Sequence, residues 1–309
     1  MPFVSFCIST YKRPQILLNQ LQLLAQQTYA DFEVVISDND PDQSARTIIE
    51  SSNDKRFKYY ANEVNLGMIQ SFNKSIERAN TAYIVMITDD DPLDVNFLNE
   101  MIPLLNTYPH RSLYCGFIRK HNDPNKIEEI ESEYFPSELL HPVKNPSIFW
   151  SNCILRKDDV IKIGLIPDYG SPHLADHALL AMTGSVSGGV IKNKIYSSHY
   201  QHENNYSKGN LDAYSTGCIG FYKLLIGYFK GHKNSKTIER AIELHLKFWF
   251  ITMSFSLRKY FYKLNDKNKL QEIDDFSKKI LSLDFMKRAI AKYQMKRIIF
   301  SVKAALGLL

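Results

Sequence analysis

Three adjacent aspartates, Asp89, Asp90 and Asp91, are the strongest candidates for chemistry in the sequence. Like charges a few ångströms apart repel, so such a cluster is costly unless a positive charge lies between its members. A divalent cation supplies that charge, and aspartate oxygens favour magnesium or manganese, which also bind phosphates. The alternative, a solvated acidic turn before Pro92, is disfavoured because the apolar strand Tyr83–Ile87 leads directly into the cluster.

Three more polar segments follow apolar runs of strand length, namely Thr10–Arg13, Asp38–Asp40 and Asn62–Gly67. In these segments the ring of Tyr11 can stack on a base, and Arg13 can pair with a phosphate. Asp38 can accept a hydrogen bond from a base or a ribose hydroxyl. Each segment also has an ordinary structural explanation, because Pro14 is typical of a helix start and Asp and Asn are frequent in turns.

Short β-rich runs and helical patterns alternate over the first 120 residues. The predicted strands are Phe3–Ser9, Phe32–Ser37, Phe57–Ala61 and Tyr83–Ile87. The predicted helices are Ile16–Ala25, Ala45–Ser51, Ile69–Ala79 and Val95–Leu105. This alternation predicts an α/β fold, a mostly parallel sheet with helices on both faces, and it brings the polar segments to the carboxyl edge, where such sheets bind ligands.

The remainder of the chain changes character twice. Residues 122–146 are rich in Glu, Pro, Asn and His and indicate an irregular excursion. Strand-like and helical pieces resume at Ile148–Leu155, Asp176–Thr183 and Gly189–Tyr200. From about Leu211 the pattern is almost wholly helical, and we find no internal repeat.

The composition limits the classes of protein to which this chain can belong. The chain has 309 residues, 44% of them hydrophobic, which is enough for a substantial core. Its four cysteines are far apart and form no Cys-x-x-Cys pair, so we expect reduced thiols and a cytoplasmic protein. The N-terminus is typical of a first strand and not of a signal peptide. The apolar run Phe248–Leu257 is much shorter than the ~20 residues of a membrane span.

The net charge of +5 is unevenly distributed, because residues from Lys223 onward carry +12 and those before it carry −7. The last basic segment, 287–300, mixes lysines with apolar residues, although Ile299 and Leu306 fall among the lysines on a helical wheel. We interpret it first as a surface for an anionic membrane. Packing on the preceding part of the chain or a homodimer contact would explain the same residues. No nucleic-acid-binding motif is present.

Taken together, the motifs of residues 1–205 resemble those of the family-2 glycosyltransferases of the GT-A fold. The segments that match are Val4–Arg13, Phe32–Asn39, Asn65–Gly67 and Tyr83–Asp91, and they occur in the family's order. The resemblance implies a GT-A catalytic domain at 1–205, with a nucleotide-sugar half (1–120) and an acceptor half (121–205). The helical, basic region 206–309 follows it.

The resemblance also implies roles for individual residues. The nucleotide sugar would contact Thr10, Tyr11, Arg13, Asp38, Asn39, Asn65, Gly67 and Asp89. Thr88 stands where the family pattern begins with Asp, so Asp89 is assigned to the ribose and Asp90 to the metal, a role that Asp91 can share. Phe72 stands where many relatives carry Arg, and this departure leaves the base and the phosphate contacts open.

The acceptor half contains the remaining candidates. Asp176 lies where inverting relatives place the general base, although the alternative is an N-cap of the helix that starts there. His199 and His202 follow a strand and are assigned as metal or diphosphate ligands, against the alternative of ordinary histidines. The acceptor pocket is assigned to Trp150, Ser151 and Asn152, with a buried tryptophan as the alternative.

These assignments predict a metal-dependent, inverting glycosyltransferase. It would use manganese or magnesium and a nucleotide-diphosphate sugar, with a UDP-sugar as the first candidate. The acceptor would be a saccharide or a lipid-diphosphate-linked saccharide of bacterial polysaccharide biosynthesis. We expect a peripheral location on the inner face of the cytoplasmic membrane. Two alternatives remain: a non-catalytic GT-A-fold subunit of a polysaccharide assembly complex, and a sugar-nucleotide nucleotidyltransferase, although the latter usually has a glycine-rich loop after the first strand.

Overall fold

The computed structural model describes residues 3–118, 123, 125–146, 148–197 and 210–308. Within these residues the chain forms two compact units. The first consists of Met1–Leu139, Val143–Asp168 and Leu174–Gln201, and the second of Leu140–Pro142, Tyr169–His173 and His202–Leu309. The four predicted strands and four predicted helices of the first 120 residues are confirmed, with ends shifted by no more than two residues.

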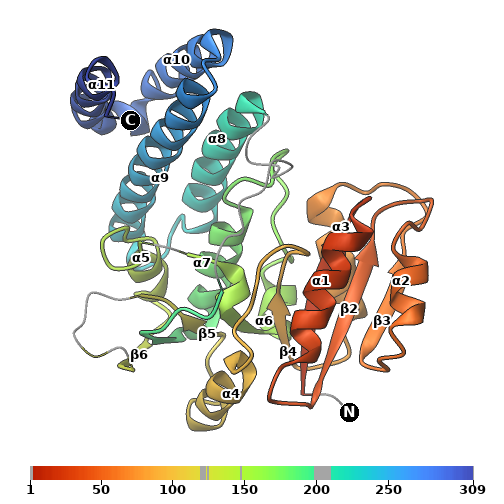
Figure 1. The fold of residues 1–309 in the computed structure, drawn as a ribbon. Helices are drawn as coiled ribbons and strands as arrows, with labels where there is room; N and C mark the ends of the chain where they lie inside the picture. The colour runs from red at the N-terminus through yellow and green to blue at the C-terminus, as the bar shows by residue number, and fades with distance from the viewer. Residues whose placement is uncertain (1–2, 119–122, 124, 147, 198–209, 309) are drawn as a thin grey trace. The chain divides into compact units, whose positions relative to one another are not determined.

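The first unit contains an eight-stranded sheet in the order β3-β2-β1-β4-β7-β5-β8-β6 (Figure 1). Its strands are β1 (Val4–Thr10), β2 (Phe32–Asp38), β3 (Phe57–Ala61), β4 (Tyr83–Met86), β5 (Leu113–Gly116), β6 (Ile127–Ile130), β7 (Cys153–Arg156) and β8 (Gly189–Lys192). The four neighbouring strands β3, β2, β1 and β4 are all parallel, as predicted. The other half is mixed, because β7 runs antiparallel to both β4 and β5, and β6 runs antiparallel to β8.

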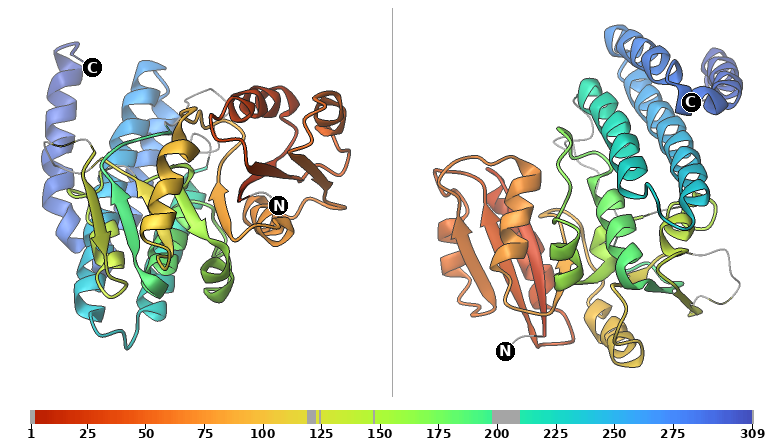
Figure 2. Two further views of the ribbon diagram at one scale, coloured as in Figure 1. Left: turned by 90° about the horizontal axis from the view of Figure 1, so that it is seen from below. Right: turned by 180° about the vertical axis from the view of Figure 1, so that it is seen from behind.

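Helices cover both faces of the sheet, because residues alternate in direction along each strand. On β1, Val4, Phe6 and Ile8 belong to the main apolar core, which also includes residues of α1 (Pro14–Ala25) and α4 (Phe97–Thr107). The alternate residues face α3 (Met68–Arg78), where Ser9 donates a 2.8 Å hydrogen bond to Ser71. Accordingly, α1 lies in front of the strands in Figure 1, and α3 lies in front in the rear view of Figure 2.

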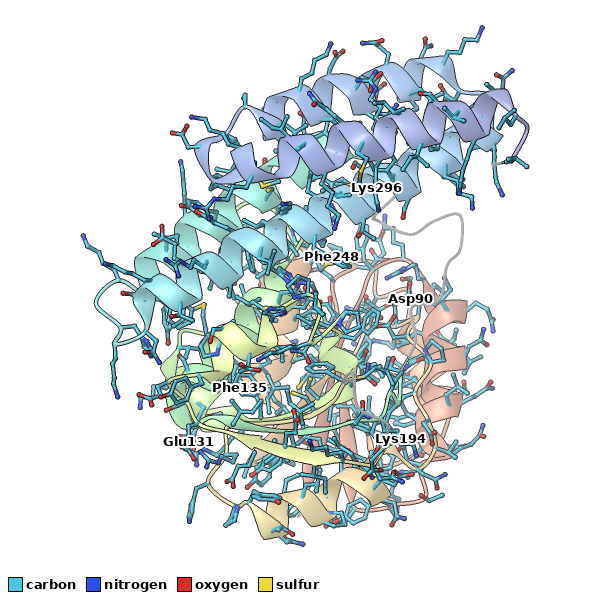
Figure 3. The ribbon with its side chains drawn as sticks, turned by 90° about the vertical axis from the view of Figure 1, so that its left-hand side faces the viewer. Asp90, Glu131, Phe135, Lys194, Phe248 and Lys296 are labelled. Atoms are coloured by element: carbon cyan, nitrogen blue, oxygen red, sulfur yellow. The ribbon has the colours of Figure 1, made fainter. Side chains whose placement is uncertain are left out.

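The segment 122–146 is more regular than predicted. It contains strand β6, and helix α5 (Phe135–Leu139) follows it. Phe135 is fully buried, and its ring takes the space that a Cβ would occupy at Gly184 or at Gly189 (Figure 3). The strand and the helix form because long-range contacts with these two glycines and with β8 outweigh the polar composition of the segment. Strand β5 was likewise absent from the sequence prediction.

The remaining helices of the first unit are short or lie in its second half. They are α2 (Arg46–Ser51), the 3₁₀ turn η1 (Trp150–Asn152), α6 (Lys157–Lys162) and α7 (Ala175–Ser187). The predicted strand Gly189–Tyr200 is shorter in the structure, where β8 ends at Lys192 and residue Ser197 pairs with Leu93 through an isolated bridge. Residues 198–200 of that prediction lie outside the described residues.

The second unit is helical, as predicted. Its helices are α8 (Leu211–Tyr228), α9 (Ser235–Lys263), α10 (Lys267–Leu281), the 3₁₀ segment η3 (Asp284–Ala289) and α11 (Ile290–Ala305). Buried Arg258 on α9 joins three of them, because it forms an ion pair with Asp274 on α10 at 2.6 Å and donates a 3.2 Å hydrogen bond to the Tyr293 hydroxyl on α11. Among the described helices, none combines the length and the apolar content that a membrane span requires.

Candidate active site

The four polar segments that follow the parallel strands lie at one edge of the sheet. The strand register aligns Thr10 with Asp38 and Asp38 with Ala61, so the residues after β1, β2 and β3 come together. Strand β4 pairs with β1 in the same direction and brings the aspartate cluster to this edge. The predicted convergence of these four strand ends is therefore confirmed, and its physical basis is the common direction of the strands.

Arg13 joins two of the three clustered aspartates. One guanidinium nitrogen lies 2.5 Å from Asp89 Oδ1, and the other lies 3.3 Å from Asp90 Oδ2. The Thr10 hydroxyl donates a 2.9 Å hydrogen bond to Asp89 Oδ2. Residues predicted separately, from the first and fourth strand ends, thus form one hydrogen-bonded group, which the sequence order alone did not reveal.

Burial makes the charge of Asp89 costly. Its side chain has no exposed surface, and this burial raises the pKa of Asp89 to about 6, although the charge of Arg13 acts to lower it. The neighbouring charge of Asp90 raises this pKa further. The cluster therefore holds more negative charge than one guanidinium neutralises, and additional positive charge would stabilise it.

The donor chemistry of this cluster fits a magnesium or manganese ion. Asp90 and Asp91 offer hard carboxylate oxygens, and the side chain of Asp90 is 12% exposed. Thr88 Oγ1 is buried beside them and has no hydrogen-bond partner within the described residues. No group of three His, Cys, Asp or Glu residues in the described chain is arranged to hold a metal. Magnesium sites commonly use only one or two carboxylates, with phosphates and water completing the coordination.

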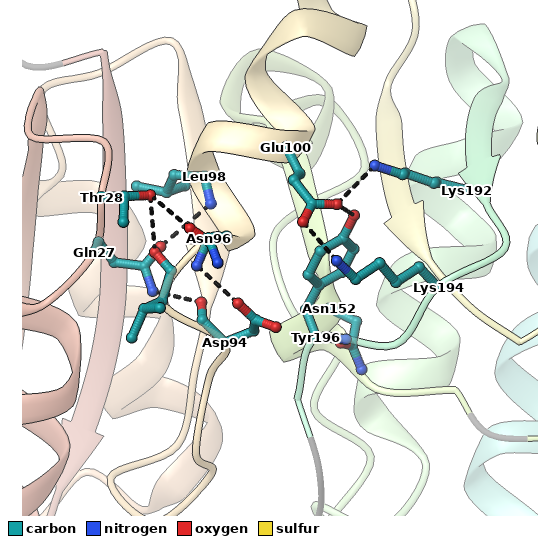
Figure 4. A network of polar contacts seen from close by, with 11 residues as sticks. Gln27, Thr28, Asp94, Asn96, Leu98, Glu100, Asn152, Lys192, Lys194 and Tyr196 are labelled. Atoms are coloured by element: carbon teal, nitrogen blue, oxygen red, sulfur yellow. Dashed lines mark hydrogen bonds and ion pairs between the residues drawn. The ribbon is translucent and has the colours of Figure 1, made fainter. Parts of the chain in front are cut away.

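Two buried glutamines, Gln20 on α1 and Gln27 just after its end, hold the segment that carries the aspartates, and neither was predicted from the sequence. Gln20 donates a 2.8 Å hydrogen bond to the Asp91 carbonyl. Gln27 donates one of 2.7 Å to the Asp94 carbonyl, as Figure 4 shows. Gln20 is only 2% exposed and lies on the same helical face as the core residues Leu17 and Leu24. In the sequence, the sign of this role is that Gln20 is a polar residue on the apolar face of a predicted helix.

We expect Gln20→Met to loosen the aspartate segment while keeping helix α1. Methionine preserves the length and most of the volume, but the buried Asp91 carbonyl loses its donor, at a cost of about 1–3 kcal/mol of folding free energy. Urea unfolding measures this cost, and calorimetry measures the expected loss of nucleotide-sugar affinity. Gln22→Met, an exposed change on the same helix, is the control. Equal stability of the two variants would show that Gln20 does not position the segment.

The segment after β2 satisfies its own polar groups. Asp38 is fully buried and accepts hydrogen bonds from the backbone N–H groups of Asp40 and Ala45 and from the Tyr59 hydroxyl, at 2.8–3.3 Å. Burial, together with the hydrogen bond to Asp38, raises the pKa of the Tyr59 hydroxyl. Asp38 therefore fixes the loop that follows β2.

The predicted Asn39, Asn65 and Gly67 form a second linked group. The Asn39 amide donates to Asn65 Oδ1 at 2.7 Å, and Asn39 Oδ1 accepts from the Leu66 N–H at 2.9 Å. Asn65 Oδ1 also accepts from the Gly67 N–H at 2.9 Å. Gly67 has φ +78°, in the left-handed region that favours glycine, and is the N-cap of α3. These bonds join the loops after β2 and β3. After β1, the ring of Tyr11 is 42% exposed.

Asp176 lies in the first turn of α7, and the N-cap is Leu174, whose φ is +67°. Asp176 therefore does not take the N-cap position that was its structural alternative. Its carboxylate lies 3.6 Å from His177 Nε2 and remains 28% exposed. His177 Nε2 in turn lies 3.3 Å from the Ile148 carbonyl. The partial exposure leaves this carboxylate accessible to a bound molecule.

The segment 148–152 connects Asp176 with the aspartate cluster. Ile148 contacts the neighbour of Asp176, while the Ser151 hydroxyl lies 3.4 Å from Asp91 Oδ2. Three consecutive Cα–Cα steps separate Ile148 from Ser151, so their Cα atoms are at most about 11 Å apart. The segment 148–152 therefore contacts both the residue next to Asp176 and the aspartate cluster.

Trp150, Ser151 and Asn152 all lie in the interior. Trp150 is 8% exposed, and its ring packs edge-on against Phe72 at 4.8 Å. Ser151 and Asn152 have no exposed surface, and Asn152 Oδ1 accepts hydrogen bonds from the Tyr196 and Ser197 N–H groups. In this structure the three residues shape the region next to Asp91, and Ser151 and Asn152 do not reach its surface.

A polar cluster anchors the chain that leads from β8 to Ser197 (Figure 4). Glu100 on α4 accepts hydrogen bonds from Lys192, Lys194 and Tyr196. Burial acts to raise the pKa of Glu100, but these three donors lower it to about 2. The charged cluster therefore holds β8 and the following residues against α4. His199 and His202, the remaining predicted ligands, lie outside the described residues.

Solved structures share this architecture. S. aureus TarS 1-349 in complex with UDP-GlcNAc has a TM-score of 0.62 and 16% identity, covering 89% of this chain and 80% of the other. The mannosyltransferase PcManGT of Pyrobaculum calidifontis, in complex with GDP-Man and Mn²⁺, has a TM-score of 0.57 and 13% identity, covering 98% and 87%. At such identities the likeness establishes the fold.

Sequence relatives are consistent with this fold. The chain is 30% identical over 171 residues to the uncharacterized glycosyltransferase MJ1057 of Methanocaldococcus jannaschii, covering 50% of this chain and 58% of that one. It is 24% identical over 114 residues to the GalNAc(5)-diNAcBac-PP-undecaprenol beta-1,3-glucosyltransferase of Campylobacter jejuni, covering 36% and 37%. The matches thus span less than two thirds of these relatives. The model of the glycosyl transferase family 2 matches residues 5–164, more than half of the chain, and the protein therefore belongs to that family.

Proposed function

We propose that this protein is a metal-dependent glycosyltransferase that moves a sugar from a nucleotide-diphosphate sugar, in first place a UDP-sugar, to a saccharide acceptor with inversion. The observation that carries the proposal is the Arg13–Asp89–Asp90 group at the carboxyl edge of the parallel strands. Family membership supports it, as do structural neighbours whose complexes contain UDP-GlcNAc, and GDP-Man with Mn²⁺.

The nucleotide would lie against the strand ends. Tyr11 presents an exposed ring on which a base can stack. Asp89 is buried and bonded to Arg13 and Thr10, so it would accept from a ribose hydroxyl only after Arg13 turns away from it. Asp38 and Asn39 keep the shape of this side through the bonds described above. Arg13, whose side chain is partly exposed, would exchange a carboxylate partner for a phosphate of the bound nucleotide-sugar.

Asp90, with Asp91 beside it, would hold a manganese or magnesium ion. Such an ion neutralises the charge that develops on the departing diphosphate. Asp176 would take the proton from the acceptor hydroxyl as that oxygen attacks the anomeric carbon, which gives inversion in a single displacement. Trp150, Ser151 and Asn152 support the acceptor side from the interior.

We place the acceptor among saccharides and lipid-diphosphate-linked saccharides of bacterial polysaccharide biosynthesis. The named activity of the Campylobacter jejuni relative, which acts on an undecaprenol-linked glycan, supports this class. A lipid-linked acceptor is confined to a membrane, so the proposal includes a peripheral cytoplasmic location on its inner face.

A panel of sugar nucleotides tests the donor class. We expect one UDP-sugar to raise the melting temperature in the presence of Mn²⁺, because a ligand that binds only the native state stabilises it. The free sugar and the free nucleoside are the controls. If no sugar nucleotide stabilises the protein, or if a chelator leaves the stabilisation unchanged, the proposed donor or the proposed metal requirement is wrong.

A further inference from the structure

Helix α11 has two apolar faces, of which one is packed. Tyr293 is 3% exposed, and its ring lies 5.6 Å from Phe250 and 5.3 Å from Phe255 of α9. Phe300, two turns further along, lies 6.2 Å from Phe255. This inner face explains why α11 is attached to the second unit, and it uses only part of the helix's apolar surface.

The opposite face of α11 is also apolar, but it is exposed. Five large side chains on it have 47–67% of their surface accessible, namely Met295, Ile298, Ile299, Val302 and Leu306. Ala291 and Ala305 are exposed between them. At 100° per residue, these seven positions form a continuous stripe roughly 120° wide. We call this set the outer stripe. Contiguous exposed apolar surface of this kind marks an interaction site.

The charge around the outer stripe has one sign. Residues 285–309 contain six Lys and Arg residues and no Asp or Glu. Lys292 and Lys303 are exposed and follow Ile299 around the helix, so they form one border of the stripe. Lys296 lies beyond them, over the ring of Phe255 (Figure 3). A surface that covers the stripe must therefore accept apolar side chains beside a row of positive charges.

We propose that the outer stripe is the surface by which this protein lies on an anionic lipid bilayer. In that position the apolar side chains enter the boundary between headgroups and acyl chains, and the bordering lysines meet lipid phosphates. Symmetrical pairing of two copies through this face fits less well, because each copy brings only positive charge within 285–309. The inference shares with the proposed function the expectation of a membrane-linked acceptor, but binding to lipid requires neither donor nor acceptor.

Co-sedimentation of the full chain with vesicles tests the proposal. We expect binding to phosphatidylcholine vesicles that contain 30% phosphatidylglycerol, and weaker binding to pure phosphatidylcholine or in high salt. Ile298→Ser with Val302→Ser should weaken the partition about tenfold or more. Lys292→Gln with Lys303→Gln should weaken it to a similar degree, because each lysine near an anionic surface contributes about fivefold. All four side chains are exposed, so folding should be preserved, and circular dichroism checks this.

Matched double changes in the first unit provide the controls. Ile161→Ser with Val143→Ser removes exposed apolar side chains, and Lys55→Gln with Lys162→Gln removes exposed lysines. Both controls should bind vesicles as the wild type does. Equal binding by the α11 variants and the wild type would overturn the proposal. A wild-type dimer that Ile298→Ser with Val302→Ser converts to a monomer, without vesicle binding, would assign the stripe to a second copy and also overturn it. Failure of vesicle binding leaves metal-dependent donor binding measurable in solution, so the two proposals can fail separately.

Discussion

Asp176→Asn is expected to lower the rate of sugar transfer by about 10²- to 10⁴-fold, the usual contribution of a general base, while leaving donor affinity unchanged. The asparagine keeps the shape of the side chain but cannot take a proton at neutral pH. Donor affinity should persist because the strand-end residues that would hold the nucleotide do not involve α7. Initial rates of transfer and calorimetric donor affinity, measured on the same preparation, separate these effects.

Asp158→Asn is the matched control for Asp176→Asn. Asp158 also lies in the first turn of a helix, α6, but it is exposed. Both variants lose a favourable charge near a helix N-terminus, which costs about 0.3–1 kcal/mol of folding free energy. Only Asp176→Asn should lose transfer. Normal turnover by Asp176→Asn would remove this residue as the base, and loss of donor affinity would assign it to binding.

Asp90→Asn is expected to abolish the metal dependence of donor binding and to reduce donor affinity in Mn²⁺ by about tenfold or more. The amide presents one neutral oxygen where the carboxylate presents two charged ones, so it holds a hard divalent cation poorly. In EDTA, the wild type and Asp90→Asn should bind the donor equally weakly. Titration of the donor with and without Mn²⁺ measures both affinities.

Asp31→Asn is the control for Asp90→Asn, because Asp31 is exposed and lies before β2, at the opposite edge of the sheet. It should retain the full effect of Mn²⁺. If Asp90→Asn also retains that effect, the metal is held without Asp90, and Asp91 becomes the ligand to test. If the wild type binds the donor equally well in EDTA, the metal assignment itself is wrong.

The parallel half of the sheet was predictable because its signals are local. β1 to β4 are apolar runs separated by helices with clear 3.6-residue periodicity, and each element could be recognised from its own residues. Strands β5 and β6 were missed for the opposite reason. Leu113–Gly116 pairs with β7 and β8, and Ile127–Ile130, half of it glutamate, pairs with β8. Such strands depend on partners distant in the sequence.

The same distinction explains the outer stripe of α11. On a helical wheel, Ile299 and Leu306 appeared to spoil an amphipathic pattern because they fall among the lysines. In the structure, Tyr293 and Phe300 turn toward α9, and the residues that looked misplaced belong to a second, exposed apolar face. A wheel shows which residues share a face, but only the neighbouring helix decides which face is covered.

By itself, the sequence determined that carboxylates and an arginine follow parallel strands, and this placement already indicated the family and the edge where a ligand binds. Only the tertiary structure decided how these side chains use their hydrogen-bonding groups. Arg13 pairs with Asp89 and Asp90, Asp38 turns inward to hold its own loop, and Gln20 supports Asp91. The physical reason is that periodicity within an element encodes burial, whereas these bonds join elements. The partners Thr10 and Asp89, for example, are 79 residues apart, and only folding brings them together.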